Sequence, residues 1–471
     1  MNRIQLQHVL QSTQGTPHHF ESSEMSFPDI SIDSRRITEG TLFWALRGEN
    51  HDAHHFLKEA AQNGAAAAVI HAEFLEQTVL PCIVVPDTYQ ALSQYAAAYR
   101  RSLETLVIGV TGSVGKTTTR EMIYSTLRTG FQGVRSPKNF NNEYGVPLSL
   151  LSINPTDEFA ILELGAARSN DLNNLIEMVL PEMGVVTEVA PAHLSTFGQI
   201  DNILQEKQKL IAALPETGLA ILNGDSPKVL LMREIAACPV VSVGFEPHNE
   251  LRAENVQTEN GKIWFEVAGD DYFLPAMGEH HIRAALCSIA IGRELGLSLA
   301  QLRDGIADFQ PMGGRCQWRQ IGQVYLIDDS YNANPASMKA AIETLQILNV
   351  TGKRILVVGD MLELGPGEIF FHHQLGQEVA KSEIEMVISF GELASSVIAG
   401  ARQYGMPSHQ TAVCNNLDSL QAVLSCCVEH GDALLVKGSR GMQMERIIQW
   451  LAEHLEEDRD DFGYQFWRPA A

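Results

Sequence analysis

Residues 105–119 read TLVIGVTGSVGKTTT, and the rest of the chain is arranged around this stretch. It opens with a run of β-branched and apolar residues at 106–110, which is typical of a buried strand. Two glycines then let backbone N–H groups approach a phosphate without a Cβ clash, and a helix start adds free N–H donors and a favourable dipole end. Lys116 can reach the β- and γ-phosphates, and the Thr117 hydroxyl can sit on Mg²⁺. The stretch therefore predicts a site for a nucleoside triphosphate.

The glycine loop is a shorter variant, G-S-V-G-K-T, because Val110 stands where the usual pattern has its first glycine. The alternative explanation is a glycine turn beside a chance lysine. It is disfavoured because a strand pattern precedes the loop and a helix pattern, at residues 121–129, follows it. Binding of a nucleoside triphosphate is the starting hypothesis.

The composition indicates an α/β protein with more than one core. The chain has 471 residues, of which 45% are hydrophobic and 37 are glycine, so two to four domains are expected. Its formal net charge of −23 argues against broad binding of nucleic acid or anionic membranes, because both require a basic surface. A small anionic substrate needs only a local basic pocket and stays possible.

Cysteine usage and hydropathy both favour a cytoplasmic protein. Seven cysteines are scattered without a CxxC pair, and the N-terminus is not signal-like. Reduced thiols in a cytoplasm are the simple interpretation. No apolar run is long enough to span a bilayer. We therefore expect a cytoplasmic protein with no membrane anchor, and we expect a monomer.

Residues 1–102 are predicted to form a small, separate α/β unit. Strand patterns lie at 41–46, 65–70 and 82–85, and helical patterns at 53–62 and 88–101.

Two polar segments of this unit are candidates for function. The first, SIDSRR at 31–36, offers a hydroxyl and two guanidiniums, which suit phosphate, although a solvated turn is an equal alternative. The second, GENHDAHHF at 48–56, has three histidines and two acids. A metal cluster is possible there, but a polar turn leading into a helix is favoured.

Residues 103–315 are predicted to form the nucleotide domain. The segment 137–151 is rich in Asn, Pro and Gly and is expected to be a loop. A helix is predicted at 201–214 and another at 278–295, with an edge hairpin region between them at 240–276. A strand, a turn and a helix N-cap at Asp225 or Ser226 are expected at 220–227.

Glu163 and His193 both fall at the carboxyl ends of predicted strands, at 159–164 and 184–194. Ligands of open α/β sheets bind beyond these ends, where the glycine loop also lies. A carboxylate and an imidazole that converge there can bind a divalent metal. The alternative is an isolated acid and a helix-capping histidine.

Residues 316–471 are predicted to form a third α/β unit. A strand is predicted at 324–329, and the segments 353–365, 385–391 and 431–445 each read as a strand that runs into a loop. Strands that alternate with helices and end at glycine indicate a parallel sheet with a ligand edge. A second dinucleotide site at 359–365 is disfavoured, because the segment lacks the G-x-G-x-x-G form. The acidic, then aromatic stretch 456–471 is expected to be a tail packed on the surface.

Taken together, the motifs resemble the Mur ligase family of cytoplasmic peptidoglycan synthesis. The resemblance covers nearly the whole chain and rests on SIDSRR, TLFWALRGENHDAHHF, TGSVGKTTTRE, KNFNNEYGVPLSLL, ILELGA, TEVAPAHL, NGD, GGR, DDSYNANPASM, GDMLELG and VKGSRGMQME. The last three favour the family member that adds a dipeptide. Relatives that add one charged amino acid are expected to carry an acceptor-reading arginine in the third domain, and CNNLDSL around Asn415 has none.

The resemblance implies an α/β fold of three domains, in which a central P-loop-type parallel sheet is flanked by a small N-terminal α/β domain and a C-terminal Rossmann-like domain. Residues 1–102 would bind the UDP-sugar, 103–315 ATP, and 316–471 the incoming amine. The implied reaction is ATP-dependent joining of D-alanyl-D-alanine to UDP-N-acetylmuramoyl-tripeptide through an acyl phosphate, with Mg²⁺, giving the pentapeptide precursor of peptidoglycan.

The same resemblance assigns individual residues. The nucleotide phosphates would be held by the glycine loop and by four residues beyond it: Gly112, Ser113, Val114, Gly115, Lys116, Thr117 and Thr118, then Asn139, Arg315, Asp329 and Asn332. The metal ligands would be Thr117, Glu163, His193 and Lys207, and the catalytic residues Lys116, Lys207 and His193. The substrates would contact Ser34 and Arg35 on the UDP side, and Asp360, Leu364, Lys437 and Arg440 on the amine side.

Three further positions, Lys207, His281 and Ala284, need separate comment. In the family a lysine at the helix position of Lys207 is carbamylated and binds magnesium; carbamylation needs a neutral amine, which burial favours by lowering the lysine pKa. A surface lysine is the alternative. The family's helix opening carries two Asn that would face adenine, and here His281 and Ala284 stand in their places.

Two other functions are alternatives to the ligase. A folylpolyglutamate-synthase-type ligase shares the logic of the central domain, but SIDSRR in the first domain argues against it, and UDP binding would discriminate. An NTP-driven switch or binding protein would hydrolyse nucleotide without any dependence on an amine.

Overall fold

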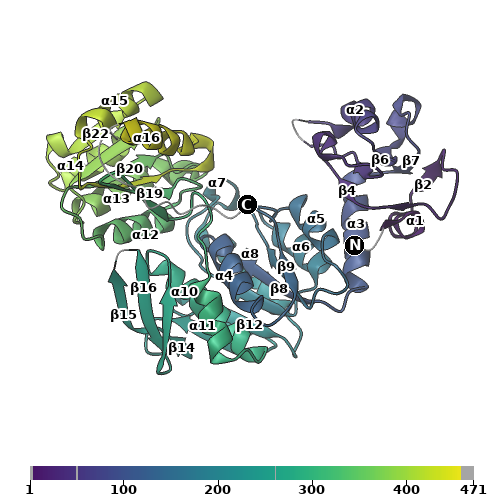
Figure 1. The fold of residues 1–471 in the computed structure, drawn as a ribbon, viewed down its shortest axis with the longest axis horizontal. Helices are drawn as coiled ribbons and strands as arrows, with labels where there is room; N and C mark the ends of the chain where they lie inside the picture. Colours follow the sequence, from purple (N-terminus) through teal and green to yellow (C-terminus); the bar gives the residue numbers. More distant parts are fainter. Residues whose placement is uncertain (1–3, 49–50, 260, 458–471) are drawn as a thin grey trace.

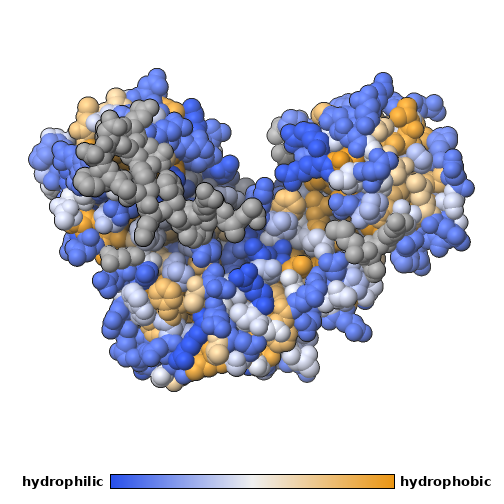
Figure 2. All heavy atoms as spheres, in the orientation of Figure 1, coloured by the Kyte–Doolittle hydropathy of each residue, from blue (hydrophilic) through white to orange (hydrophobic). Residues whose placement is uncertain are grey.

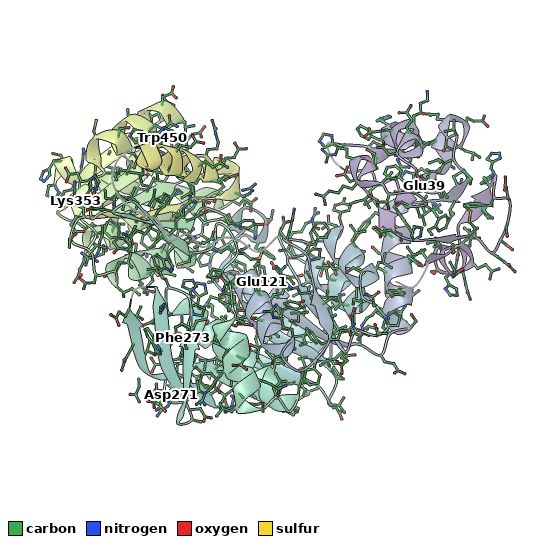
Figure 3. All side chains as sticks on the ribbon, in the orientation of Figure 1. Glu39, Glu121, Asp271, Phe273, Lys353 and Trp450 are labelled. Atoms are coloured by element: carbon green, nitrogen blue, oxygen red, sulfur yellow. The ribbon has the colours of Figure 1, made fainter. Side chains whose placement is uncertain are left out.

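The computed structural model describes residues 4–48, 51–259 and 261–457. Three α/β units follow one another along the chain and lie in an open V, with the central unit at its base (Figure 1). Figure 3 adds the side chains to this view and labels Glu39 on the first unit, Glu121 on the central unit and Trp450 on the third. No helix in the described ranges is long and apolar enough to cross a membrane. The predicted tail lies outside the described residues beyond α16 (Glu445–Glu457).

The first unit is built on a five-stranded sheet, ordered β2-β7-β6-β5-β4, in which only β2 is antiparallel, and on a two-stranded pair, β1 with β3. The strands are β1 (Ile4–Gln5), β2 (Thr16–His18), β3 (Ser26–Phe27), β4 (Ile30–Ser31), β5 (Leu42–Trp44), β6 (Ala67–His71) and β7 (Cys82–Val85). The helices are α1 (Leu6–Thr13), α2 (Leu57–Gln62) and α3 (Thr88–Arg101), with short 3₁₀ turns η1 (Ser34–Arg36), η2 (Ala53–Phe56) and η3 (Ala72–Gln77). The three strands and the helix at 88–101 were predicted within two residues.

The central unit is a seven-stranded sheet, ordered β14-β13-β12-β11-β8-β10-β9, and every pairing in it is parallel. Its strands are β8 (Leu106–Thr111), β9 (Gly133–Arg135), β10 (Phe159–Glu163), β11 (Met183–Val186), β12 (Leu219–Asn223), β13 (Val240–Gly244) and β14 (Leu251–Arg252). Its helices are α4 (Lys116–Leu127), α5 (Gly145–Leu151), α6 (Asp171–Val179), α7 (Leu194–Phe197), α8 (Ile200–Ala212), α9 (Pro227–Leu230), α10 (His280–Glu294) and α11 (Leu299–Ala307), with the turn η4 (Leu231–Ile235). The central strands are apolar throughout because helices cover both faces of a parallel sheet.

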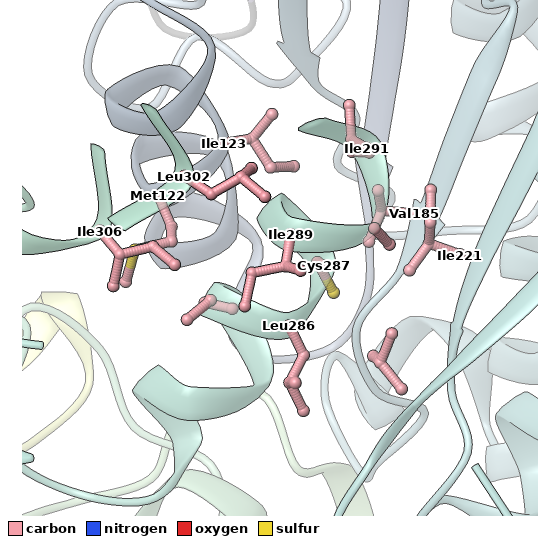
Figure 4. Close-up of a cluster of buried hydrophobic side chains, with 14 of the residues drawn as sticks. Met122, Ile123, Val185, Ile221, Leu286, Cys287, Ile289, Ile291, Leu302 and Ile306 are labelled. Carbon is pink, nitrogen blue, oxygen red and sulfur yellow. The ribbon is translucent and has the colours of Figure 1, made fainter. Parts of the chain in front are cut away.

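One face of this sheet carries the largest core. Ile123 of α4, Leu302 of α11 and Ile289 of α10 belong to one buried cluster with Val185 and Ile221 of the sheet (Figure 4). Burial of such side chains stabilises the fold by roughly 1.5–3 kcal/mol each. The core therefore fixes α4, and with it the glycine loop at its N-terminus.

A three-stranded antiparallel sheet, β15 (Glu254–Glu259), β16 (Lys262–Val267) and β17 (Asp270–Leu274), projects beside the central sheet (Figure 1). The expected edge hairpin region is confirmed for these strands. It is wrong for β13, which is an inner strand of the parallel sheet, because Val243 joins the main core.

The expectation of a loop at 137–151 is also wrong in its second half, where α5 forms. The Asn142 carboxamide accepts hydrogen bonds from the amides of Tyr144 and Gly145 at the helix start, 3.3 and 2.9 Å long. Val146 and Leu150 are then buried beneath the helix. Asn142, one of the residues that indicated a loop, therefore accepts hydrogen bonds at the start of α5. The apolar residues 146–151 that follow it form the helix.

The third unit has a six-stranded sheet, ordered β18-β19-β23-β20-β21-β22, in which only β18 is antiparallel. Its strands are β18 (Gln317–Ile321), β19 (Val324–Asp329), β20 (Arg354–Gly359), β21 (Met386–Phe390), β22 (Thr411–Cys414) and β23 (Ala433–Lys437). Its other helices are α12 (Pro335–Gln346), α13 (Glu368–Ala380), α14 (Ala394–Gln403) and α15 (Leu417–Cys427), with turns η5 (Gly365–Gly367), η6 (Ser408–Gln410) and η7 (Arg440–Met442). The predicted parallel sheet is confirmed, and the ligand edge stays a prediction.

Candidate active site

A cavity of about 1270 Å³ lies where the three units meet, and all three line it. Gly48 and Tyr89 come from the first unit, the glycine loop from the second, and Asn332 and Lys437 from the third. Hydrophilic residues gather at the base of the gap between the outer units (Figure 2). A cavity of this size holds several reactants at once.

The glycine loop, residues 112–115, connects β8 to α4 and lies against β11. Gly112 has φ +151°, and a Cβ there would sit 1.9 Å from the Thr187 hydroxyl oxygen. Gly115 has φ +86° and precedes the first turn of α4. Only glycine fits both positions, and the loop leaves the amides at the start of α4 directed at the cavity, where an anion binds well.

Glu163 closes the far side of the loop. It is buried at the end of β10, and the Thr117 hydroxyl donates to its Oε2 at 2.8 Å. Asn141 Nδ2 donates to Oε1 at 2.7 Å, and Arg120 donates to Oε2 at 3.3 Å. Arg120 is in turn shared with Glu121, the labelled carboxylate of the central unit in Figure 3. These donors hold the carboxylate in one orientation beside the phosphate site.

Basic groups surround the same space. The Lys116 ammonium donates to the Gly112 carbonyl at 2.7 Å. Burial lowers the pKa of Lys116, an effect that Glu163 opposes and Arg315 reinforces. Lys207 is buried on α8, and burial together with the charge of Lys116 lowers its pKa to about 7. A polyphosphate would relieve this mutual repulsion.

His193 stands at the N-terminus of α7 and lines the cavity. Burial lowers the pKa of its imidazole, as do the nearby charges of Lys116 and Lys207. The carboxylate of Glu363, from the third unit, forms a hydrogen bond with Nδ1 and opposes that shift. The predicted convergence of Glu163 and His193 on the glycine loop is therefore present in the geometry.

The wall from the third unit is a connected polar network. The Lys437 ammonium donates to the Asp329 carboxylate at 2.6 Å and to the Asn332 carbonyl at 2.9 Å. Arg315 lies over the ring of Tyr331, with 4.2 Å between the guanidinium carbon and the ring centre. The Asp329 carboxylate also accepts a hydrogen bond from the amide of residue 316, at 3.0 Å. This bond fixes the start of the third unit to the end of β19.

The structure brings most of the predicted site residues together in the cavity wall. These are Gly112, Ser113, Val114, Gly115, Lys116, Thr117, Thr118, Asn139, Glu163, His193, Lys207, Arg315, Asp329, Asn332 and Lys437. Their roles toward ligands stay predictions.

Five predicted substrate-binding residues do not line this cavity. Ser34 is buried and Arg35 is exposed beside Asp33, both in the first unit. Asp360 is buried and accepts from the amides of residues 392 and 393, and Leu364 belongs to the core of the third unit. The Arg440 guanidinium pairs with Glu445 at 2.9 Å.

The wall expected to meet adenine has an unusual composition. His281 is turned into the core, where its ring forms a 2.6 Å hydrogen bond with the Met277 carbonyl. Ala284 lines the cavity, as does Arg283, which pairs with Asp225 at 3.0 Å. The Arg283 guanidinium and the Asp225 carboxylate therefore lie beside His281 and Ala284, the two positions at which the family carries asparagine.

Sequence reasoning missed three residues that shape the site: Arg120, Asn141 and Glu363. Arg120 and Asn141 lie inside two of the motifs that were recognised, but nothing in the sequence of those motifs indicated a contact with Glu163. Glu363 lies in GDMLELG, far along the chain, and only the packing of the third unit on α7 brings it to His193.

The donor set fits magnesium in part. Within the described ranges, no three His, Cys, Asp or Glu side chains are grouped tightly enough to hold a metal by themselves. The hydroxyl of Thr117 and the carboxylate of Glu163 are hard oxygen ligands of the kind Mg²⁺ prefers, and phosphate oxygens and water complete such sites. A charged Lys207 would repel the ion, whereas a neutral or carbamylated amine would not. In the polar segment 48–56, Glu49 and Asn50 lie outside the described residues, and residues 53–56 form the turn η2, where the Asp52 carboxylate accepts a hydrogen bond from the His54 amide.

Comparison with protein families gives three consecutive matches. The Mur ligase family, catalytic domain, matches residues 28–100; the Mur ligase middle domain matches 110–292; and the Mur ligase, glutamate ligase domain, matches 314–440. A curated relative is the UDP-N-acetylmuramoyl-tripeptide–D-alanyl-D-alanine ligase of Bacillus subtilis, which is 32% identical over 95% of this chain and 98% of its own.

Solved structures give the same picture. MurF from Acinetobacter baumannii superposes with a TM-score of 0.87 and 29% identity, over 96% of this chain and 99% of that one. MurF ligase from Thermotoga maritima, in complex with ADP, superposes with a TM-score of 0.80 and 27% identity, over 91% and 98%.

Proposed function

The chain belongs to the Mur ligase family, and from that premise we propose that it joins D-alanyl-D-alanine to UDP-N-acetylmuramoyl-tripeptide at the expense of ATP. The product is the pentapeptide precursor of peptidoglycan, with ADP and phosphate. The observation that carries the proposal is one cavity in which the phosphate loop of the central unit faces the basic wall of the third. The full-length likeness to ligases of this name supports the choice of substrates.

The reaction needs two transfers in one closed space. The tripeptide carboxylate attacks the γ-phosphate of ATP, which forms an acyl phosphate and releases ADP. The amine of the dipeptide then attacks the activated carbonyl, and the tetrahedral intermediate collapses to an amide and phosphate. Positioning of aligned reactants contributes roughly 7–11 kcal/mol to such a reaction. Exclusion of water matters because an acyl phosphate hydrolyses.

The residues of the chain would divide this work. Lys116 and the α4 amides would hold the β- and γ-phosphates, and Arg315, Asn139, Asp329 and Asn332 would close on the nucleotide. Thr117, Glu163, His193 and Lys207 would hold Mg²⁺, which when bound would offset the charge that builds up on the transferring phosphoryl group. We include carbamylation of Lys207 in the proposal, and its buried amine with a pKa of about 7 supports it.

The substrate ends would lie in the outer units. Ser34 and Arg35 would bind the uridine diphosphate. Lys437 and Arg440 would take the terminal carboxylate of the dipeptide, while Asp360 and Leu364 would act through the loop that they anchor. Because ATP and a UDP-linked precursor are cytoplasmic metabolites, we place the activity in the cytoplasm. We keep the domain limits 1–102, 103–315 and 316–471 in this proposal.

The test is phosphate release from ATP in the presence of UDP-N-acetylmuramoyl-tripeptide, with D-alanyl-D-alanine, single amino acids or no amine. We expect release only when the nucleotide peptide and the dipeptide are both present. Dependence on a single amino acid would assign the chain to another member of the family. Release that ignores every amine would reject the ligase and leave only nucleotide hydrolysis.

A further inference from the structure

One loop of the third unit, residues 361–367, reaches the central unit and docks on α7. The amide of Ser195 donates to the carbonyl of Glu363 at 3.1 Å, and the carboxylate of the same residue bonds to Nδ1 of His193. The backbone at Gly365 lies so close that a Cβ there would be 3.3 Å from the Cα of Ser195. The side-chain bond, the backbone bond and the close packing at Gly365 thus form one contact between the third unit and the central unit.

The two residues that make this contact share an uncommon backbone conformation. Glu363 has φ +64° and His193 has φ +51°. Left-handed φ values cost free energy in residues other than glycine, and they gather at functional sites where the surroundings enforce them. Here each residue directs its side chain at the other across the domain boundary.

The hydrogen bond has a chemical consequence for the imidazole. A carboxylate on Nδ1 accepts its proton, so the lone pair stays on Nε2. His193 lines the cavity together with Thr117, Glu163 and Lys207. The contact therefore fixes both the tautomer and the orientation of a ring at the phosphate site.

We propose that Glu363 is a positioning residue that couples the docking of the third unit to the orientation of His193. The imidazole is held for its role only when the loop 361–367 has reached α7, so the phosphate site is complete only with the amine-binding unit in place. This inference rests on the proposed function for the identity of the reaction, and it adds a residue from another domain to the site. Premature hydrolysis of ATP would be restrained by the same coupling.

The test compares Glu363→Ala with Glu363→Gln and with the matched control Glu368→Gln, whose exposed carboxylate lies at the start of the next helix, α13. Binding of Mn²⁺ to the ADP-bound protein is followed by electron paramagnetic resonance. Hydrogen exchange of the peptide at 193–198 reports the docking of the loop. The values of kcat and KM are measured with saturating dipeptide.

We expect Glu363→Ala to weaken Mn²⁺ binding and to lower kcat, each by about tenfold or more, as is usual for partners of metal ligands. Exchange at 193–198 should quicken, and KM for the UDP substrate should change little. Glu363→Gln keeps an acceptor for the imidazole and should recover part of the loss, and Glu368→Gln should match wild type.

Gly365→Ala provides an independent route to the same result, because its Cβ pushes the loop from α7 while Glu363 stays intact. If Glu363→Ala and Gly365→Ala both match Glu368→Gln in Mn²⁺ binding, exchange and kcat, the proposal is wrong. Failure of the wild type to ligate would overturn the proposed function instead, and exchange at 193–198 would still decide the coupling.

Discussion

Lys116 is the residue on which phosphate transfer depends most directly. Its half-buried side chain places the ammonium at the mouth of the glycine loop, and desolvation lowers its pKa. Lys116→Ala should lower kcat by a factor of about 10²–10³ or more, the usual effect of removing one charge-stabilising donor. The melting temperature should not fall, because the deleted group is a partly desolvated charge held by one carbonyl.

This first prediction is checked by product formation and by thermal unfolding of the same samples. The control is Lys58→Ala, an exposed lysine on α2. Turnover of Lys116→Ala at the wild-type rate would contradict the phosphate-site assignment, and a shared loss with Lys58→Ala would point to a general effect of charge.

His281 makes stability depend on pH. Burial lowers the pKa of its imidazole to about 4, whereas an unfolded chain would show about 6.5. Below pH 6.5 the unfolded state binds a proton that the native state refuses, so the stabilisation present above pH 6.5 is lost as the pH falls towards 4. This group alone should reduce the free energy of unfolding by about 2 kcal/mol between pH 7 and pH 5.

The measurement is urea unfolding of the wild type and of His281→Asn at pH 7 and pH 5. The variant should lose less stability across this interval, with His280 unchanged in both proteins. Equal losses would show that His281 does not carry the dependence.

At the scale of elements, the strands and helices with strong periodicity were the predictable part. The strand at 106–110, the helix at 88–101 and the end of β10 at Glu163 agree with the structure within one residue. The helix after the glycine loop begins at Lys116 instead of 121. The three threonines at 117–119 have low intrinsic helix propensity, which local sequence reasoning cannot set against their tertiary packing. The helix at 145–151 was missed because the asparagines before it, of which Asn142 bonds to its first amides, are residues typical of loops.

Glu206 joins two elements of the central unit. From α8 its buried carboxylate accepts the amides of Asn170 and Leu172 at the start of α6, at 3.0 and 2.8 Å, and it pairs with Lys209 at 2.7 Å. Glu206→Ala leaves the buried amide of Leu172 and the part-buried amide of Asn170 without this acceptor and should destabilise the protein by about 1–3 kcal/mol.

Denaturant unfolding measures this loss, with Glu177→Ala as control, because Glu177 is an exposed carboxylate on α6 itself. The control should stay within about 0.5 kcal/mol of wild type. A Glu206→Ala protein as stable as the control would mean that α6 needs no cap from α8.

At the scale of the whole molecule, the site was predictable only in parts. The glycine loop, Glu163 and His193 were predicted to lie near one another because each follows the carboxyl end of a strand. In a parallel sheet these ends lie along one edge. The approach of the third unit does not follow from any local pattern. Asp360 illustrates the difference: its motif indicated a substrate contact, whereas the fold turns its carboxylate to two backbone amides of its own domain.

The placement of the first unit depends on α3, which serves two cores. Leu92 and Tyr95 pack inside the first unit, while Ala96 belongs to a core of the central unit. The buried Arg100 near its end donates to the carbonyls of residues 179 and 180, at 2.8 and 3.0 Å, and to the Glu182 carboxylate at 2.6 Å. Because Glu182 also accepts the amide of Val107, this one side chain fixes α3 to the start of β8.

Arg100→Met keeps the length of the side chain and removes every donor, so the partly exposed carboxylate of Glu182 and the carbonyls of residues 103, 179 and 180 lose a partner. We expect a loss of about 1–3 kcal/mol, as for buried polar groups left without a hydrogen bond, and a rise in KM for the UDP substrate that exceeds the fall in kcat. Unfolding curves, kinetics and small-angle scattering together measure these effects, and Arg101→Met, an exposed neighbour, is the control. If the two variants behave alike in stability and KM, then Arg100 does not set the position of the first unit. If only Arg100→Met loosens the scattering envelope, this one guanidinium holds the first unit in its place against the central unit.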